Sequence, residues 1–206
     1  MKFLLLSIVI LTAFCACEDC STKQVICPAF SDTSFANWFP YVDKQKLIFS
    51  SGGVKDTFTL TNSDFSKIYQ TTISGNNPGC NAYARLSFSP TDSLGNSSFD
   101  IYANKQLDQY SNNKILSSQI FLKNRRFYGN LTDSGMQPRV YEQNLYSSHF
   151  YSSYTIGTTT YQNLQEYYID TTKTVFKSNE IYKIWIAKGT GLAAYEEYHG
   201  KLWVKL

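Results

Sequence analysis

Residues 181–206 read IYKIWIAKGTGLAAYEEYHGKLWVKL and carry the clearest secondary-structure signal in the chain. Three short apolar runs are separated here by two glycine-containing turns, Lys188–Gly191 and His199-Gly200. Apolar runs of about four to eight residues joined by such turns predict a three-stranded antiparallel meander. The last run alternates, so Trp203 is expected on the face opposite to Leu202, Val204 and Leu206.

The same alternation recurs upstream, from Lys46 to Tyr128. A hairpin is predicted where two such runs flank Ser50-Ser51-Gly52-Gly53. The 16 Tyr and 14 Phe, with only 17% charged residues, are typical of half-buried strands. We therefore expect an all-β fold in one domain, residues 27–206. About nine or ten antiparallel strands would form a meander that curls into an open barrel or sandwich.

One aromatic cluster lacks strand alternation, and a short helical turn is expected there, near residues 32–38. Asp32 or Ser31 can cap the start of this turn. Pro40 disfavours helix at Phe39, so the turn should end there.

Five aromatic residues are candidates for ligand binding: Trp38, Tyr41, Tyr154, Tyr161 and Trp203. Tyrosine among small polar residues is typical of binding surfaces, but it is equally typical of rings that cover a sheet. The second sheet face is mostly Thr, Ser, Lys and Tyr, which favours a glycan or protein partner over an apolar ligand. Exposed coplanar rings would favour a glycan, whereas a sheet closed on its own side chains would favour a structural role.

Catalytic motifs are absent from the sequence. It contains no Gly-x-Ser-x-Gly, no His-Glu-x-x-His and no glycine-rich phosphate loop. The adjacent acids Glu196 and Glu197 should point to opposite faces of one strand, although Asp100, Glu142 and Glu166 could converge. We expect a non-enzymatic protein without a cofactor, and the formal net charge of +3 gives little support to nucleic-acid binding.

Residues 1–16 have the features of a signal peptide. Lys2 precedes the apolar run Phe3–Ala13, which is too short to span a bilayer. The run ends in Phe14-Cys15-Ala16-Cys17, which resembles a bacterial lipoprotein box. The resemblance implies cleavage before Cys17 and acyl chains on its sulfur and amino group. Cys15 is the rival position, and secretion without a lipid is the alternative.

The remaining cysteines predict one disulfide. Residues 17–26 are interpreted as a tether, which contains Cys20. Cys27 and Cys80 each lie beside a chain-bending Pro or Gly, so we expect these two to pair and Cys20 to stay free. No Cys-x-x-Cys pair occurs and only two histidines are present, so no metal site is expected.

Both ends of the mature chain resemble all-β lipoproteins of Bacteroidota. At the start the resemblance is carried by Cys27–Asp32, Trp38–Tyr41 and Leu47–Phe49, and at the end by Ile186–Glu196 with Gly200 and Trp203. The acid pair Glu18-Asp19 is similar to the acids that follow the lipidated cysteine in surface-exposed members. The resemblance implies a lipid-anchored protein of the cell envelope, at the outer membrane.

Together these features predict a non-catalytic, structural or interaction lipoprotein whose membrane contact is the lipid on Cys17. The alternative is a lipoprotein that binds a glycan or an apolar ligand on a Tyr/Trp-rich sheet face.

The variant Cys17→Ser is expected to leave the membrane fraction, because each buried acyl methylene contributes about 0.8 kcal/mol to membrane binding. Membrane fractionation and intact mass of the natural and variant proteins, made in the native host, measure this. The lipoprotein interpretation is wrong if both forms are soluble and begin elsewhere than at residue 17.

Overall fold

The computed structural model describes residues 29–206 apart from 66–67, 74–76, 92–97, 108–115 and 140–144. These residues form one helix and thirteen strands. The elements are α2 (Thr33–Trp38), β1 (Lys46–Ser51), β2 (Val54–Asp64), β3 (Ile68–Ile73), β4 (Asn77–Pro90), β5 (Phe99–Leu107), β6 (Leu116–Leu122), β7 (Arg125–Thr132), β8 (Gly135–Gln137), β9 (Tyr146–Ile156), β10 (Thr159–Ile169), β11 (Ile181–Ala187), β12 (Gly191–Glu197) and β13 (Lys201–Lys205).

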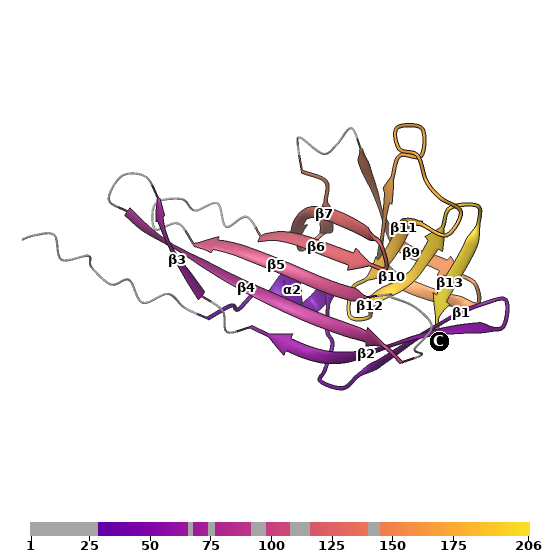
Figure 1. Ribbon diagram of the computed structural model, residues 1–206, viewed down its shortest axis with the longest axis horizontal. Coiled ribbons are helices and arrows are strands. Elements are labelled where there is room, and N and C mark those ends of the chain that lie inside the picture. Colours follow the sequence, from indigo (N-terminus) through magenta and orange to yellow (C-terminus); the bar gives the residue numbers. More distant parts are fainter. Residues whose placement is uncertain (1–28, 66–67, 74–76, 92–97, 108–115, 140–144) are drawn as a thin grey trace, which may run out of the picture.

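The strands form one antiparallel sheet in the order β8-β7-β6-β5-β4-β2-β1-β13-β12-β11-β10-β9, with β3 beside β4 off this path. The sheet curls into a nearly closed barrel (Figure 1). β1 pairs with β13, with Phe49 opposite Lys205, so the first and last strands of the sequence are neighbours.

The predicted all-β fold is confirmed, but nine or ten strands was too low a number. The meander at 181–206 is β11 to β13, and the hairpin around Gly52-Gly53 is β1 and β2. Alternation did not reveal β9, because most of its side chains are half-buried or exposed and leave no apolar period.

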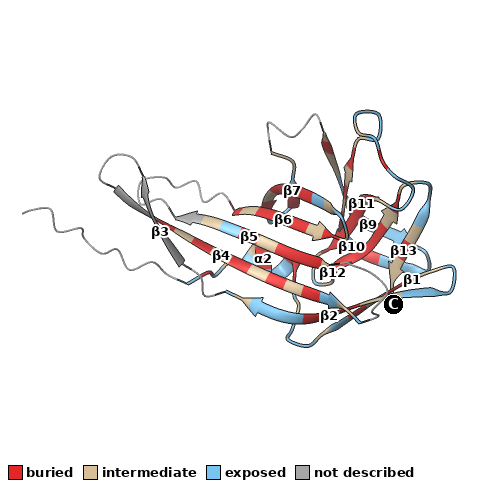
Figure 2. Cartoon of the chain, in the orientation of Figure 1, coloured by how far each residue is buried: buried red, intermediate tan, exposed pale blue. Residues whose placement is uncertain are grey.

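The barrel interior is filled by side chains of the sheet itself. In β6, buried and half-buried residues alternate along the whole strand. Figure 2 shows the same alternation along β4, whereas Phe99, Asp100 and Ile101 of β5 are all buried. Aromatic rings dominate the interior, as where Phe88 and Phe99 stack with ring centroids 4.6 Å apart. A sheet that buries one face in this way satisfies its apolar residues without a ligand.

A smaller apolar cluster lies on the outer face of β10 to β13. It contains Ile156, Tyr161, Leu164, Trp185 and three alanines, with Leu202 and Val204 packed against it. The tip of the β9–β10 hairpin covers these strands, since a Cβ on Gly157 would lie 3.7 Å from Val204. Strand β13 is therefore apolar on both faces, and Trp203 lies in the interior cluster, opposite to Leu202 and Val204.

Helix α2 packs at one end of the barrel and confirms the predicted helical turn. The Asp32 carboxylate caps it by accepting a hydrogen bond from the Phe35 N–H at 3.0 Å. The same side chain accepts from Lys105 Nζ on β5 at 2.7 Å, which ties the helix to the sheet. Trp38, at the last helical position, is fully buried in the interior cluster.

Lys123 covers the opposite end of the barrel. It lies in the β6–β7 turn with a left-handed backbone (φ 55°). Its Nζ is 3.0 Å from the Asp56 carboxylate and 3.1 Å from the Glu197 carboxylate. The ammonium also lies 4.9 Å from the centre of the Trp203 ring. This ionic contact joins β2, β12 and the β6–β7 turn over the buried tryptophan.

A side chain links the edge strand β8 to β10, which lies next to the other edge strand, β9. Gln165 on β10 is fully buried. Its Nε2 donates to the Met136 carbonyl on β8, and the Met136 N–H donates to its Oε1. The side-chain amide thus makes the two hydrogen bonds that a peptide group of a neighbouring strand would make with Met136. Gly135, with φ +103°, is required beside it because a Cβ there would overlap Oε1 of Gln165.

Cys80 on β4 is buried and disulfide-bonded. The other four cysteines lie outside the described residues, so its pairing with Cys27 stays a prediction, as does the lipid on Cys17.

The variant Gln165→Leu should lose about 2–5 kcal/mol of unfolding free energy, because the buried N–H and C=O of Met136 lose their partners. Urea unfolding measures this. The matched control is Gln162→Leu on the same strand, whose exposed amide donates only to Ser153 Oγ and whose loss should stay within about 0.5 kcal/mol. Equal losses of unfolding free energy in the two variants would show that the contact between Gln165 and Met136 does not stabilise the fold.

Candidate functional site

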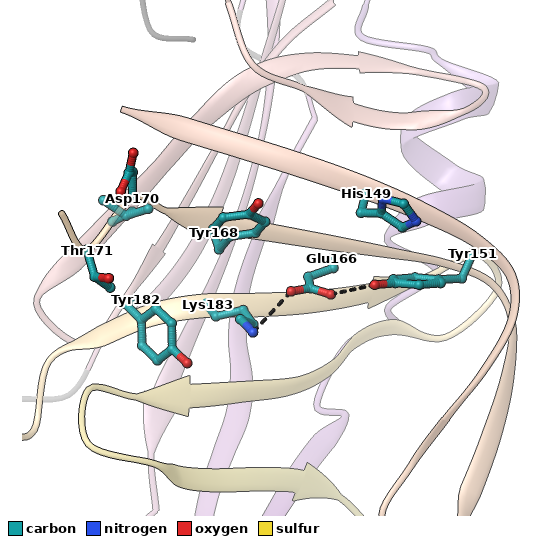
Figure 3. Close-up of a pocket in the computed structure, with 9 residues that line it drawn as sticks. His149, Tyr151, Glu166, Tyr168, Asp170, Thr171, Tyr182 and Lys183 are labelled. Atoms are coloured by element: carbon teal, nitrogen blue, oxygen red, sulfur yellow. Dashed lines mark hydrogen bonds and ion pairs between the residues drawn. The ribbon is translucent and has the colours of Figure 1, made fainter. Parts of the chain in front are cut away.

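A pocket of about 400 Å³ lies on the outer face of β9, β10 and β11 (Figure 3). We call it the tyrosine site, and six of its lining residues define it: His149, Tyr151, Glu166, Tyr168, Tyr182 and Lys183. The pocket combines aromatic rings with charged groups of both signs. It is within the range typical of small-molecule sites.

Strand geometry places the charged pair of the site on the outer face. On β10, Gln165 and Tyr167 point into the barrel, so Glu166 between them points outward. On β11, Lys183 lies opposite Tyr168 of β10, so it is diagonal to Glu166 on the same face. The register shift between β11 and β12, from Ile181 to Lys183, places Lys183 opposite Glu196.

Lys183 and Glu166 form the polar centre of the site. Lys183 Nζ is 3.1 Å from Glu166 Oε1 and 3.7 Å from Glu196 Oε2, and Tyr151 donates its hydroxyl proton to Glu166 Oε2 at 2.9 Å. Burial alone would lower the pKa of Lys183, but the hydrogen bond and charge of Glu166 outweigh it and raise that pKa. Burial and then the Glu166 carboxylate raise the pKa of Tyr151 to about 12. The lysine is therefore charged and the tyrosine neutral near pH 7.

Three rings on β9 form a row along the pocket. The His149 and Tyr151 rings are 4.4 Å apart at 51°, and the Tyr151 and Tyr154 rings are 4.5 Å apart at 34°. Strict alternation would put Tyr151 and Tyr154 on opposite faces. Opposite this part of β9, Asn163 of β10 has a left-handed backbone (φ 52°), which interrupts the alternation. The row is tilted and not coplanar.

The five aromatic candidates from the sequence are not brought together. Trp38 is in the interior, Trp203 stacks on Tyr195 there with centroids 5.8 Å apart, and Tyr161 is buried in the outer cluster. The Tyr41 hydroxyl accepts a hydrogen bond from the Leu192 N–H at 2.6 Å. Tyr154 alone among them belongs to the ring row, and 38% of it is exposed.

The acids that could have formed a catalytic pair are separated. Glu196 pairs with Lys183 on the outer face, whereas Glu197 pairs with Lys123 at the end of the barrel. Asp100 lies on β5, in a different pocket from Glu166, and Glu142 is outside the described residues. Among the described residues, no group of three or more His, Cys, Asp or Glu side chains could hold a metal ion.

Comparisons with family models, with curated proteins and with solved structures find no match for this chain. In the described part of the chain, no helix has the length and apolarity needed to cross a bilayer.

The variant Glu166→Gln should lower the pKa of Lys183, because the nearest carboxylate no longer stabilises the ammonium. NMR titration of labelled lysine side chains, with Lys183→Arg to assign the signal, measures this. Glu196→Gln is the control and should lower the pKa less, since that carboxylate is 3.7 Å away. A larger decrease in the control would mean that Glu196 is the principal partner. The ion pair's stabilisation is complete below the unfolded lysine pKa and is lost as the pH rises through the raised folded value.

Proposed function

We propose that this protein is a non-catalytic lipoprotein of the cell envelope, anchored through Cys17, that binds carbohydrate at the tyrosine site. The observation that carries the proposal is that the rings of His149, Tyr151 and Tyr154 lie beside the Glu166 and Lys183 pair. Because the rings are tilted and do not form a coplanar platform, the proposal depends on the ion pair as well as on the rings. Aromatic faces pack against the apolar faces of sugar rings. Carboxylates accept and ammonium groups donate hydrogen bonds to sugar hydroxyls.

The polar groups of the tyrosine site already pair with one another, which supports a neutral ligand. Lys183 is shared by two carboxylates, and Tyr151 is held by one of them. Preorganised donors and acceptors recognise hydroxyl groups with little reordering. A strongly charged ligand would have to displace these contacts, so the ligand class that fits is a neutral sugar.

The filled interior supports placing the ligand outside the barrel. The largest interior side chains, including Phe49, Phe58 and Phe99, are fully buried. An apolar ligand would have to displace several of them, at about 1.5–3 kcal/mol for each large apolar side chain re-exposed to water. This observation equally supports the second candidate function, a structural envelope protein without a small ligand, and the experiment below separates the two.

Binding of the purified mature domain to an array of neutral glycans tests the proposal. The natural protein should bind a subset of neutral glycans, and Tyr151→Ala should weaken that binding about ten-fold, which corresponds to about 1.4 kcal/mol. Tyr154→Ala should act in the same direction, because its ring continues the row.

Phe150→Ala is the matched control. Phe150 is an exposed aromatic residue of the same strand, and its neighbour in register is the inward-pointing Gln165. The control should bind like the natural protein. Absence of glycan binding by the natural protein, or equal loss in Phe150→Ala and Tyr151→Ala, would favour the structural function instead.

A further inference from the structure

A second and larger pocket, of about 1050 Å³, lies on the outer face of β4 to β7. Its lining follows the strand register. One row across the four strands is Arg85, Tyr102, Gln119 and Tyr128, and the next is Asp100, Phe121 and Arg126, with Ser87 beside Asp100 just outside the lining. Residues opposite one another on neighbouring strands have Cβ atoms about 4.5–5.5 Å apart, so these rows make a grid of side chains. We call this surface the basic groove.

The charge of the basic groove is positive. Arg85, Arg126 and Arg139 line it, and Asp100 is the acid in its lining. Asp100 is already engaged: Ser87 donates its hydroxyl proton to the carboxylate at 2.6 Å, and Arg85 lies 3.3 Å from the same oxygen. The groove therefore has an excess of guanidinium groups, while the whole chain has a formal net charge of only +3.

Aromatic rings hold two of these arginines in place. The guanidinium carbon of Arg85 is 5.0 Å from the centre of the Tyr102 ring, and that of Arg126 is 5.5 Å from the centre of the Phe121 ring. Arg126 also donates to the Tyr128 hydroxyl at 3.4 Å. The Nε of Arg85 is buried without a hydrogen-bond partner. Planar guanidinium groups ordered in this way suit the bidentate binding of carboxylate or sulfate.

We propose that the basic groove is a second ligand site, which binds an acidic polysaccharide carrying uronate or sulfate groups. The arginines supply the anion contacts, and Tyr102 and Tyr128 supply ring faces for sugar residues. The pocket volume is at the upper end of the range of about 300–1,000 Å³ for small-molecule sites, as an oligosaccharide segment requires. The lining also carries amide and hydroxyl side chains such as Gln119 and Ser117, which match sugar hydroxyls.

This site is independent of the proposed function at the tyrosine site, because the two pockets share no lining residue. A chain with both sites would hold a neutral and an acidic polysaccharide on different parts of its surface.

Binding to polygalacturonate and to chondroitin sulfate tests the proposal, with dextran as the neutral polymer. The natural protein should bind at least one of the two acidic polymers through this groove, and it should not bind dextran there. Its affinity for the acidic polymer should fall as the salt concentration is raised. Arg126→Gln should weaken binding at least five-fold and Arg85→Gln/Arg126→Gln at least ten-fold. Arg126 is exposed, so the single variant keeps the test valid if the double variant does not fold.

The matched control is Lys46→Gln/Lys55→Gln, which removes two exposed positive charges from β1 and β2. It should bind acidic polymers like the natural protein, as should Tyr151→Ala. The proposal is overturned if neither acidic polymer binds or if the lysine control loses as much affinity as the arginine variant. It is also overturned if phosphatidylglycerol vesicles bind more tightly through the same arginines, which would identify a lipid surface instead.

Discussion

The contact between Gln165 and Met136 is the constraint on which the shape of the molecule depends. A sheet whose edge strands stay apart exposes unpaired peptide groups and one apolar face. Here a side-chain amide from β10 occupies the backbone donor and acceptor of β8, so the sheet closes without a continuous ladder. The nearby Tyr167 hydroxyl donates to the Tyr128 carbonyl and strengthens the same closure.

Closure determines where a ligand can bind. Because the interior is occupied by the protein's own rings and its two ends are covered by α2 and by Lys123, the polar outer face is the surface left for recognition. Two stretches of that face are shaped differently. Around Lys183 the charged groups pair with one another and carboxylates outnumber the ammonium, whereas the face that carries Arg85 has an excess of positive charge. The fold thus separates two kinds of polar chemistry on one sheet.

The strands could be predicted from the sequence where burial determines which positions are apolar. β6 alternates because one face is buried, and β11 and β12 of the C-terminal meander read as short apolar runs because both faces are buried. The tyrosine site could not be predicted, because it depends on the left-handed backbone of Asn163 and on the β10–β11 pairing that places Lys183 diagonal to Glu166, and neither leaves a pattern in the sequence. Trp38 and Trp203 were candidates for ligand binding because they are large aromatic residues. Both are buried, and residue type alone does not tell which face of the sheet a ring occupies.

If Cys17 carries the proposed lipid, the position of α2 favours one orientation of the molecule at a membrane. The described chain begins at Ala29, and the Phe30 N–H donates to the Phe65 carbonyl beside this helix. Eleven residues lie between Cys17 and Ala29, so a lipid on Cys17 leaves a reach of at most about 43 Å over twelve residue steps. A protein anchored there would turn its helical end toward the lipid and the Lys123 end away from it. Both outer pockets would then open sideways, toward polymers that run parallel to the membrane surface.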